Sequence, residues 1–129
     1  MLIVEDDPVF LRIMKEIVSS GFPFVSLIEA GNGEEAMAKL EAAGPRVVFM
    51  DISLPDTNGL KLAKTMKERN PDVRVVIVTN HDTPEHREAA YEAGADSFIS
   101  KSANVAREVE SSIRSLVPWA LRNENNLPA

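Results

Sequence analysis

The chain has 129 residues, about the length of one domain, and its 44% apolar and 26% charged residues are typical of a globular protein with a buried core. Lys and Arg number 14 against 20 Asp and Glu, and the resulting net charge of −6 disfavours direct binding to nucleic acid. The absence of cysteine excludes disulfides, thiolate catalysis and sulfur-ligated metals.

Short apolar runs bounded by turn residues alternate with segments of helical spacing. The runs predict strands at residues 2–4, 24–28, 47–50, 75–78 and 97–100. Capping residues indicate three of the helix starts: Asp7, Asn32 and Thr83. The predicted inner faces of the five helices are, in chain order, Phe10, Ile13, Met14 and Ile17; Ala36, Leu40 and Ala43; Leu60, Ala63 and Met66; Ala89, Ala90 and Ala93; and Val105, Val109, Ser112, Ile113 and Leu116.

Five strands alternating with five helices predict an α/β fold, a doubly wound five-stranded parallel sheet of order 2-1-3-4-5 with helices on both faces. We expect residues 1–121 to form the domain and residues 122–129 to be a flexible tail or the start of a linker. The first predicted strand, residues 2–4, is shorter than usual, so we expect the chain to begin part-way into it.

Polar side chains follow four of the five predicted strands. The first strand runs into Glu5, Asp6 and Asp7, the third into Asp51, the fourth into Thr79 and the fifth into Lys101. Asp7 is interpreted mainly as the cap of the following helix, and each of the others taken alone could serve a turn or a helix end. Because the carboxyl ends of parallel strands meet at one edge of a sheet, the combination favours a functional site.

Three neighbouring carboxylates repel one another, by about 4 kcal/mol for a close pair at an effective dielectric of about 20, so we expect a bound cation beside Asp51. Oxygen ligands without His or Cys favour Mg²⁺, with Mn²⁺ as an alternative. A carboxylate nucleophile beside a cation, a hydroxyl (Thr79) and an ammonium group (Lys101) has the parts for phosphoryl transfer. Asp51 would then become an aspartyl phosphate.

Four segments carry a resemblance to a known family: Leu-Ile-Val-Glu-Asp-Asp, Met-Asp-Ile-Ser-Leu-Pro-Asp-Thr-Asn-Gly, Val-Ile-Val-Thr and Gly-Ala-Asp-Ser-Phe-Ile-Ser-Lys. Their order along the chain is far more specific than any one of them. From residue 2 to about residue 117, the chain resembles the receiver domain of bacterial response regulators, the signalling proteins of two-component systems.

The resemblance implies a role for each site residue. Asp51 matches the phosphoacceptor, while Glu5, Asp6, Asp51 and the backbone carbonyl of Ser53 match the metal site, with Asp6 the closer acidic ligand of the first pair. Thr79 and Lys101 match the residues that contact the phosphoryl group. Thr79 and Phe98 match the switch pair, and Phe98 can also be a core residue of an edge strand.

The sequence departs from the family pattern at three places. Ser102 follows Lys101 where many receivers have proline and a cis bond; we expect a trans bond, with displacement of Lys101 as one consequence. Asn80 stands where a small residue is usual, and His81 comes next, so access to a phosphoryl group is narrower. Ser53 lies at a position where receivers vary. We expect His81 and His86 to be exposed rather than ligands.

The resemblance also implies partners and a cellular setting. The phosphoryl donor is expected to be a sensor histidine kinase or a histidine phosphotransfer protein, and a homodimer through the fourth helix, fifth strand and fifth helix is an option. The domain would catalyse its own phosphorylation and dephosphorylation without being a turnover enzyme. No apolar run is long enough for a membrane span, so a cytoplasmic protein is expected.

Two other functions share parts of the pattern. A haloacid-dehalogenase-like phosphatase also uses an aspartate nucleophile and Mg²⁺, but it resembles Asp-x-Asp where this chain has Asp51 and Ser53. A flavodoxin-like binding module shares the fold, but the acids at 5–7 would repel a flavin phosphate. About a dozen residues follow the last predicted helix, so we expect either a stand-alone receiver or one separated from its output domain.

Overall fold

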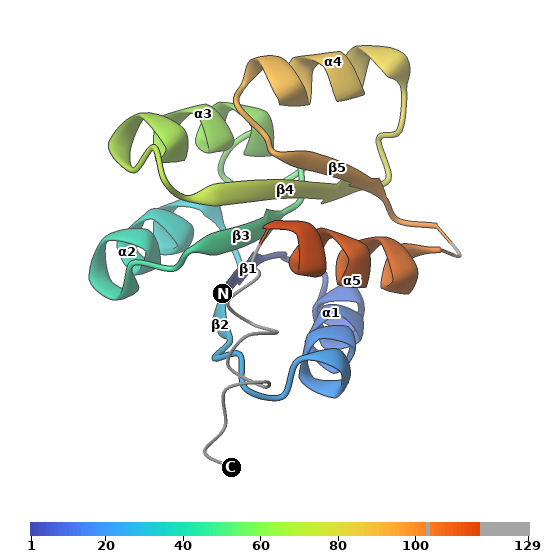
Figure 1. Ribbon diagram of the computed structural model, residues 1–129. Helices are drawn as coiled ribbons and strands as arrows, with labels where there is room; N and C mark the ends of the chain where they lie inside the picture. Colours follow the sequence, from blue (N-terminus) through green and yellow to red (C-terminus); the bar gives the residue numbers. More distant parts are fainter. Residues whose placement is uncertain (103, 117–129) are drawn as a thin grey trace.

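Figure 1 shows the computed structural model, in which residues 1–102 and 104–116 are described. Strands and helices alternate along the chain, as the sequence predicts. In order they are β1 (Leu2–Val4), α1 (Pro8–Gly21), β2 (Ile28–Ala30), α2 (Gly33–Ala43), β3 (Val47–Met50), α3 (Gly59–Arg69), β4 (Arg74–Thr79), α4 (Pro84–Glu92), β5 (Ser97–Ser100) and α5 (Val105–Leu116). The predicted domain boundary at residue 121 and the predicted tail 122–129 lie outside the described residues.

The five strands form one parallel sheet of order β2-β1-β3-β4-β5, which confirms the predicted topology. β1 lies between β2 and β3, and its last residue, Val4, pairs with Ala30 on one side and Met50 on the other. The residues that follow, Glu5 and Asp51, therefore leave the same edge of the sheet side by side.

Side-chain caps define the starts of the first four helices. The capping residues are Asp7, Asn32, Asn58 and Thr83. Each side-chain oxygen accepts a hydrogen bond from a backbone N–H of the first turn, which would otherwise have no partner. The sequence predicts three of these caps; Asn58, which places the start of α3 directly behind the loop that follows Asp51, is the additional one.

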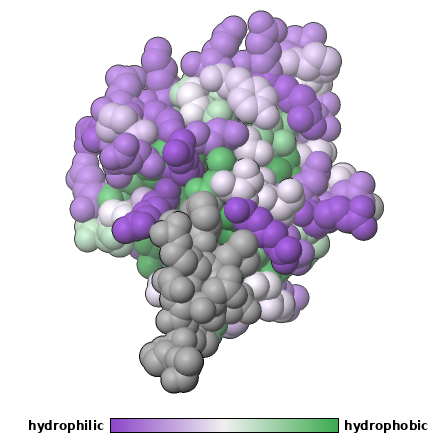
Figure 2. All heavy atoms as spheres, in the orientation of Figure 1, coloured by the Kyte–Doolittle hydropathy of each residue, from purple (hydrophilic) through white to green (hydrophobic). Residues whose placement is uncertain are grey.

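Helices cover both faces of the sheet (Figure 1). The helices α1 and α5 pack together on one face, and α2, α3 and α4 cover the other. The first core is centred on Met14, Val18 and Ile113, and the second includes Met66 and Phe98. Figure 2 shows mainly polar side chains on the outer surface in this view, with apolar side chains in the recesses between them.

The helices contribute very unequally to these cores. The helix α5 buries Val109 and Ile113 completely, whereas Ala90 is the one residue of α4 that is fully buried. Because an alanine removes much less apolar area from water than a valine or an isoleucine, α4 is held to the sheet by less hydrophobic free energy than α5.

The second strand differs from its prediction. The sequence predicts a strand at 24–28, but the structure has it at Ile28–Ala30. Phe24 is 47% exposed, and the N–H of Val25 donates to the carbonyl of Phe22 in a turn, so this apolar run belongs to the connection after α1. Only from Ile28 onward does the chain pair with Leu2.

Two residues that were predicted to lie on the buried faces of their helices, Ile13 and Ala43, are exposed. Ile13 is 39% exposed, and Val18 is fully buried in its place, because the buried stripe of α1 runs through Met14 and Val18, one turn apart. Ala43 is exposed at the end of α2, where Gly44 takes a left-handed conformation (φ 56°) and ends the helix.

Candidate functional site

An acidic cluster lies at the carboxyl ends of β1 and β3. Glu5 and Asp6 follow β1, and Asp51 follows β3; one carboxylate oxygen of each lies within 4.8 Å of the others. Glu5 is buried, with 4% of its surface exposed, whereas Asp6 is open to solvent. The structure therefore brings together the three acids that the sequence predicts as neighbours.

Lys101 crosses from the end of β5 into this cluster. Its Nζ donates to Glu5 Oε1 at 2.5 Å and to Asp51 Oδ2 at 2.9 Å, and it lies 4.3 Å from the centre of the Phe10 ring. The predicted trans bond between Lys101 and Ser102 is confirmed. Lys101 is not displaced as a consequence: although the bond to Ser102 is trans, its side chain still reaches Asp51.

Burial and charge act against each other in this cluster. Burial raises the pKa of Glu5, and the hydrogen bond and charge of Lys101 only partly oppose it. Burial is the largest single influence on Lys101 and opposes its charged form, but the hydrogen bonds and the negative charges of Glu5 and Asp51 together outweigh it and raise the pKa of the ammonium group. One ammonium against three carboxylates leaves an excess of negative charge, which suits a divalent cation.

The acids differ in how many of their oxygens are already engaged. Glu5 Oε2 accepts from the backbone N–H groups of Asp6 (3.1 Å) and Asp7 (3.5 Å), and Oε1 accepts from Lys101. Within the described part of the chain, no hydrogen bond reaches the Asp6 carboxylate or Asp51 Oδ1. These oxygens are the ones available to a cation or to an incoming phosphorus atom.

A tight loop after β3 presents Asp51 and Ser53. Ser53 pairs with Asn58 in an isolated antiparallel bridge, and the N–H of Gly59 donates to the carbonyl of Ile52 at 2.6 Å. A Cβ atom on Gly59 would overlap the backbone carbonyl of Asp51, so only glycine allows the start of α3 to pack this closely. The role of the Ser53 carbonyl as a metal ligand stays a prediction.

Thr79 closes the site on the β4 side. It is the last residue of β4, is fully buried, and its carbonyl accepts from the N–H of Lys101 at 2.9 Å. Its Oγ1 accepts from the N–H of His81 at 3.1 Å, which leaves the hydroxyl hydrogen available to donate. The hydroxyl and the lysine predicted to act together thus lie at the carboxyl ends of neighbouring strands, with Thr79 ending β4 and Lys101 directly following β5.

Phe98 is a residue of β5, and its side chain lies in the core on the α4 side of the sheet. It pairs with Ile77 in the sheet and is 5% exposed, in the core beneath α4. The expected core position is confirmed, and its part in a switch stays a prediction.

The two histidines form contacts that sequence reasoning missed. His81 is exposed as predicted, and its Nε2 lies 2.9 Å from Ser53 Oγ. His86, which was also predicted to be exposed, is half-buried instead, with Nδ1 2.7 Å from Thr83 Oγ1. The two rings stack with their centres 5.3 Å apart. No sequence signal indicates the Ser53 contact, because the two residues come from different loops.

Asp56 is a further residue that the sequence did not single out. Its carboxylate accepts from the N–H groups of Gly33 (2.7 Å) and Glu34 (3.0 Å) at the start of α2, although it lies in the loop after β3. These bonds lower the pKa of Asp56. The loop that carries Asp51 is thereby anchored to a neighbouring helix.

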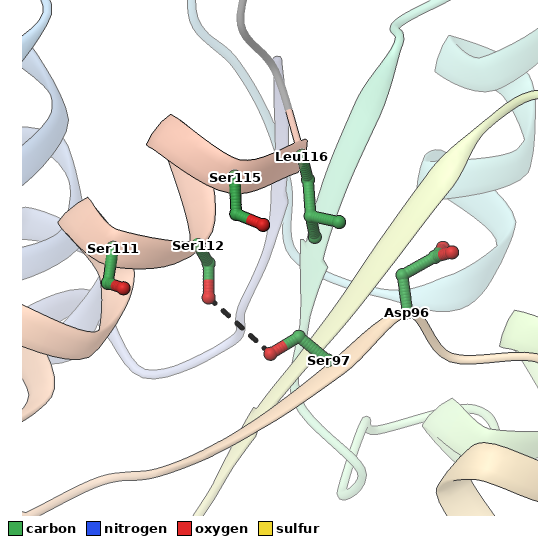
Figure 3. Close-up of a pocket in the computed structure, with 6 residues that line it drawn as sticks. All are labelled: Asp96, Ser97, Ser111, Ser112, Ser115 and Leu116. Atoms are coloured by element: carbon green, nitrogen blue, oxygen red, sulfur yellow. Dashed lines mark hydrogen bonds between the residues drawn. The ribbon is translucent and has the colours of Figure 1, made fainter.

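A separate hollow of about 190 Å³ lies at the opposite end of β5 (Figure 3). Serines from α5 line it, and Ser97 Oγ lies 3.4 Å from Ser112 Oγ. Its one carboxylate, Asp96, is already bonded to Lys67 and to the N–H of Val75. The acidic cluster, rather than this hollow, therefore holds the reactive groups.

The comparison with protein families agrees with this geometry. The sequence profile of the response regulator receiver domain matches residues 1–112, and the chain belongs to this family. Its members are signalling proteins of two-component systems, and the phosphatase and flavodoxin-like alternatives are not favoured.

Individual relatives support the same assignment. The chain is 31% identical to the chemotaxis protein CheY of Thermotoga maritima over 85% of this chain and 92% of that protein. It is 32% identical to the transcriptional activator protein ExaE of Pseudomonas putida over 93% of this chain and 56% of that one. The chain spans only part of several curated relatives, between 31% and 56% of the length of three of them.

A solved structure matches the fold. The CheY-like response regulator receiver domain protein from Methanospirillum hungatei is 28% identical, with a TM-score of 0.82 over 95% of each chain. Among the described residues, no helix has the length and apolar character needed to cross a membrane.

We predict that Asp56 makes the domain more sensitive to acid. Because its pKa is lowered in the folded state, its stabilisation is present above the ordinary pKa of an aspartate and is lost as the pH falls through the lowered pKa. D56N should unfold at lower urea concentration than the wild type at about pH 7, and the two should converge as the pH falls.

D72N, which removes another exposed aspartate, controls for the loss of one negative charge. A difference between wild type and D56N that stays constant across the acid range would contradict the prediction.

Proposed function

We propose that Asp51 accepts a phosphoryl group from a partner phosphohistidine and that this changes the surface of α4, β5 and α5. The observation that carries the proposal is the pair of hydrogen bonds from Lys101 to Glu5 and Asp51, which sets one lysine among the acids. The buried Thr79 ends the next strand, β4, at the same edge of the sheet. This arrangement combines a carboxylate nucleophile with groups that stabilise charge on transferring oxygens.

The transfer step follows from which oxygens are free. Asp51 Oδ1 attacks phosphorus, the bond from phosphorus to the donor imidazole nitrogen breaks, and the imidazole leaves with the electron pair. Lys101, already bonded to Asp51 Oδ2, offers its ammonium group to the transferred oxygens. Thr79 can donate its hydroxyl hydrogen to one of them, since its oxygen already accepts from His81.

Mg²⁺, or Mn²⁺, is the proposed cofactor. Asp6, Asp51 and Glu5 supply only oxygen donors, and the Asp6 carboxylate is exposed, so the set fits a hard divalent cation that retains water ligands. The Ser53 carbonyl is proposed to complete the set. When bound, the cation would neutralise charge on the carboxylates and the phosphoryl oxygens.

We predict that phosphorylation depends on Asp51. With acetyl phosphate and Mg²⁺, the intact mass of the wild type should increase by one phosphoryl group, and D51N should gain none because an amide oxygen is a poor nucleophile. D72N, at an exposed loop position, should be labelled like the wild type. Labelling of D51N at the wild-type rate would refute the assignment.

Metal binding should depend on Asp6. We expect Mg²⁺ to raise the Tm of the wild type, because a ligand that binds only the folded state stabilises it, and D6N to need about tenfold more Mg²⁺ for the same rise. D7N is a matched control, since asparagine can still cap α1 through its side-chain oxygen. Equal Mg²⁺ dependence in wild type and D6N would contradict this ligand set.

The phosphohistidine partner is proposed to dock beside the acidic cluster on α1. Val9 is 66% exposed and Ile13 39% exposed, and they lie one turn apart on the helix that follows the acidic turn. Two exposed apolar side chains one turn apart, on the helix that begins at the acidic turn, offer a protein partner area to bury. A homodimer through α4, β5 and α5 is a second proposed contact, on the side of Phe98.

V9S/I13S should separate docking from chemistry. Transfer from a phosphorylated histidine phosphotransfer protein that labels the wild type should slow about tenfold, while labelling by acetyl phosphate stays unchanged. F24S, at another exposed apolar residue (47%), is the matched control. Equal transfer rates for the double variant and the wild type would exclude this docking surface.

A further inference from the structure

Phe10 on α1 lies against the lysine of the acidic cluster. Its ring faces the ammonium group of Lys101, whose Nζ lies 4.3 Å from the ring centre. The ring is half-buried and packs at the edge of the core that includes Met14 and Val18. An aliphatic side chain would fill the same space, so packing alone does not account for an aromatic ring beside a charge.

The ring is a third contact for an ammonium group that has two hydrogen-bond acceptors. Of the three N–H donors of Lys101, Glu5 Oε1 and Asp51 Oδ2 accept two, and among residues 1–102 and 104–116 no other acceptor is within hydrogen-bond distance of Nζ. The side chain is only 9% exposed, so water competes little with the ring. Because the face of an aromatic ring carries partial negative charge, it attracts a cation most strongly where water is excluded.

The ring is placed by the same short segment that carries Glu5. Phe10 lies in the first turn of α1, and Asp7 caps this turn by accepting a backbone N–H bond of 2.9 Å at its side chain. The N–H of Asp7 in turn donates to Glu5 Oε2 at 3.5 Å. One segment therefore fixes both the carboxylate and the ring that contact Lys101.

The ring and the carboxylates hold the lysine in different ways. A carboxylate holds an N–H through a directional hydrogen bond, so Glu5 competes with a phosphoryl oxygen for the same proton. A ring face attracts the charge without requiring one particular hydrogen bond. The ammonium group can therefore exchange Glu5 for a phosphoryl oxygen while it stays on the ring and close to Asp51.

We propose that Phe10 is a positioning residue for Lys101: the face of its ring holds the ammonium group beside Asp51 while its hydrogen-bond acceptors change. The inference rests on the proposed function, because Lys101 acts there on the transferred oxygens. It adds to the site an apolar residue that acts through the lysine and touches no reacting atom.

The test weakens the attraction of the ring face and keeps the ring. Trifluorophenylalanine in place of Phe10 has nearly the same shape, but its fluorine atoms withdraw electrons from the face and remove most of its attraction for a cation. In the unphosphorylated domain, the ammonium protons of Lys101, assigned by NMR from their loss in K101M, should exchange with water about two- to tenfold faster. Labelling by acetyl phosphate with Mg²⁺ should slow by a similar factor.

Two controls separate the contact with the charge from packing in the core. Trifluorophenylalanine in place of Phe49, which is buried in the same core, should change neither the exchange of the Lys101 protons nor the labelling rate. F10L fills the space with an aliphatic side chain and should behave like the protein with the trifluorinated ring at residue 10.

Equal exchange of the Lys101 protons in the wild type and in the protein trifluorinated at residue 10 would overturn the proposal, and so would equal labelling of the two by acetyl phosphate. The exchange measurement needs no phosphate, so it decides on Phe10 even if Asp51 is never labelled. Failure of acetyl phosphate to label the wild type would count against the proposed function instead.

Discussion

The ammonium group of Lys101 is the interaction on which the candidate site depends. By bonding Glu5 and Asp51 together, it ties the end of β5, at one edge of the sheet, to the ends of β1 and β3 in its interior. All three side chains are nearly shielded from water, at 9%, 3% and 11% exposure, so screening by solvent is weak. Breaking such a buried pair typically costs about 3–5 kcal/mol, because the remaining charge is left without a partner. The lysine therefore fixes the acids in place as well as offsetting their repulsion.

The same lysine leaves the site unbalanced in charge. It satisfies Glu5 and one oxygen of Asp51, yet burial still raises the pKa of Glu5, which shows that the carboxylate is less stable there than in water. The exposed Asp6 adds negative charge without adding a partner. Because negative charge is in excess at this site, a bound cation would stabilise the folded domain, so cation binding would be coupled to the stability of the fold.

Most of this arrangement could be predicted from the sequence because it depends on local pattern and on sheet topology. Apolar runs indicated the strands, and the parallel order then brought Glu5, Asp51 and Lys101 to one edge. The errors came where an apolar run in the sequence is exposed to solvent in the structure. Phe24, for example, was predicted to lie in a strand but is 47% exposed in the connection before β2. Contacts between segments far apart in sequence had no local signal; the clearest example is the bond from Gly33, at the start of α2, to Asp56, 23 positions further along the chain.

The two faces of the sheet respond differently to a change at this edge. On one face α5 is anchored by Val109 and Ile113, so displacing it would expose large apolar side chains to water. On the other, α4 contributes little more than Ala90 to the core, and polar contacts such as that of Arg87 with Asp82 hold the connection in front of it. Weak apolar packing means that moving α4 costs little free energy, while exposed polar bonds can exchange with water at small cost. A local rearrangement around Thr79 would therefore meet less resistance toward α4 than toward α5, because the small residues of α4 contribute little apolar packing.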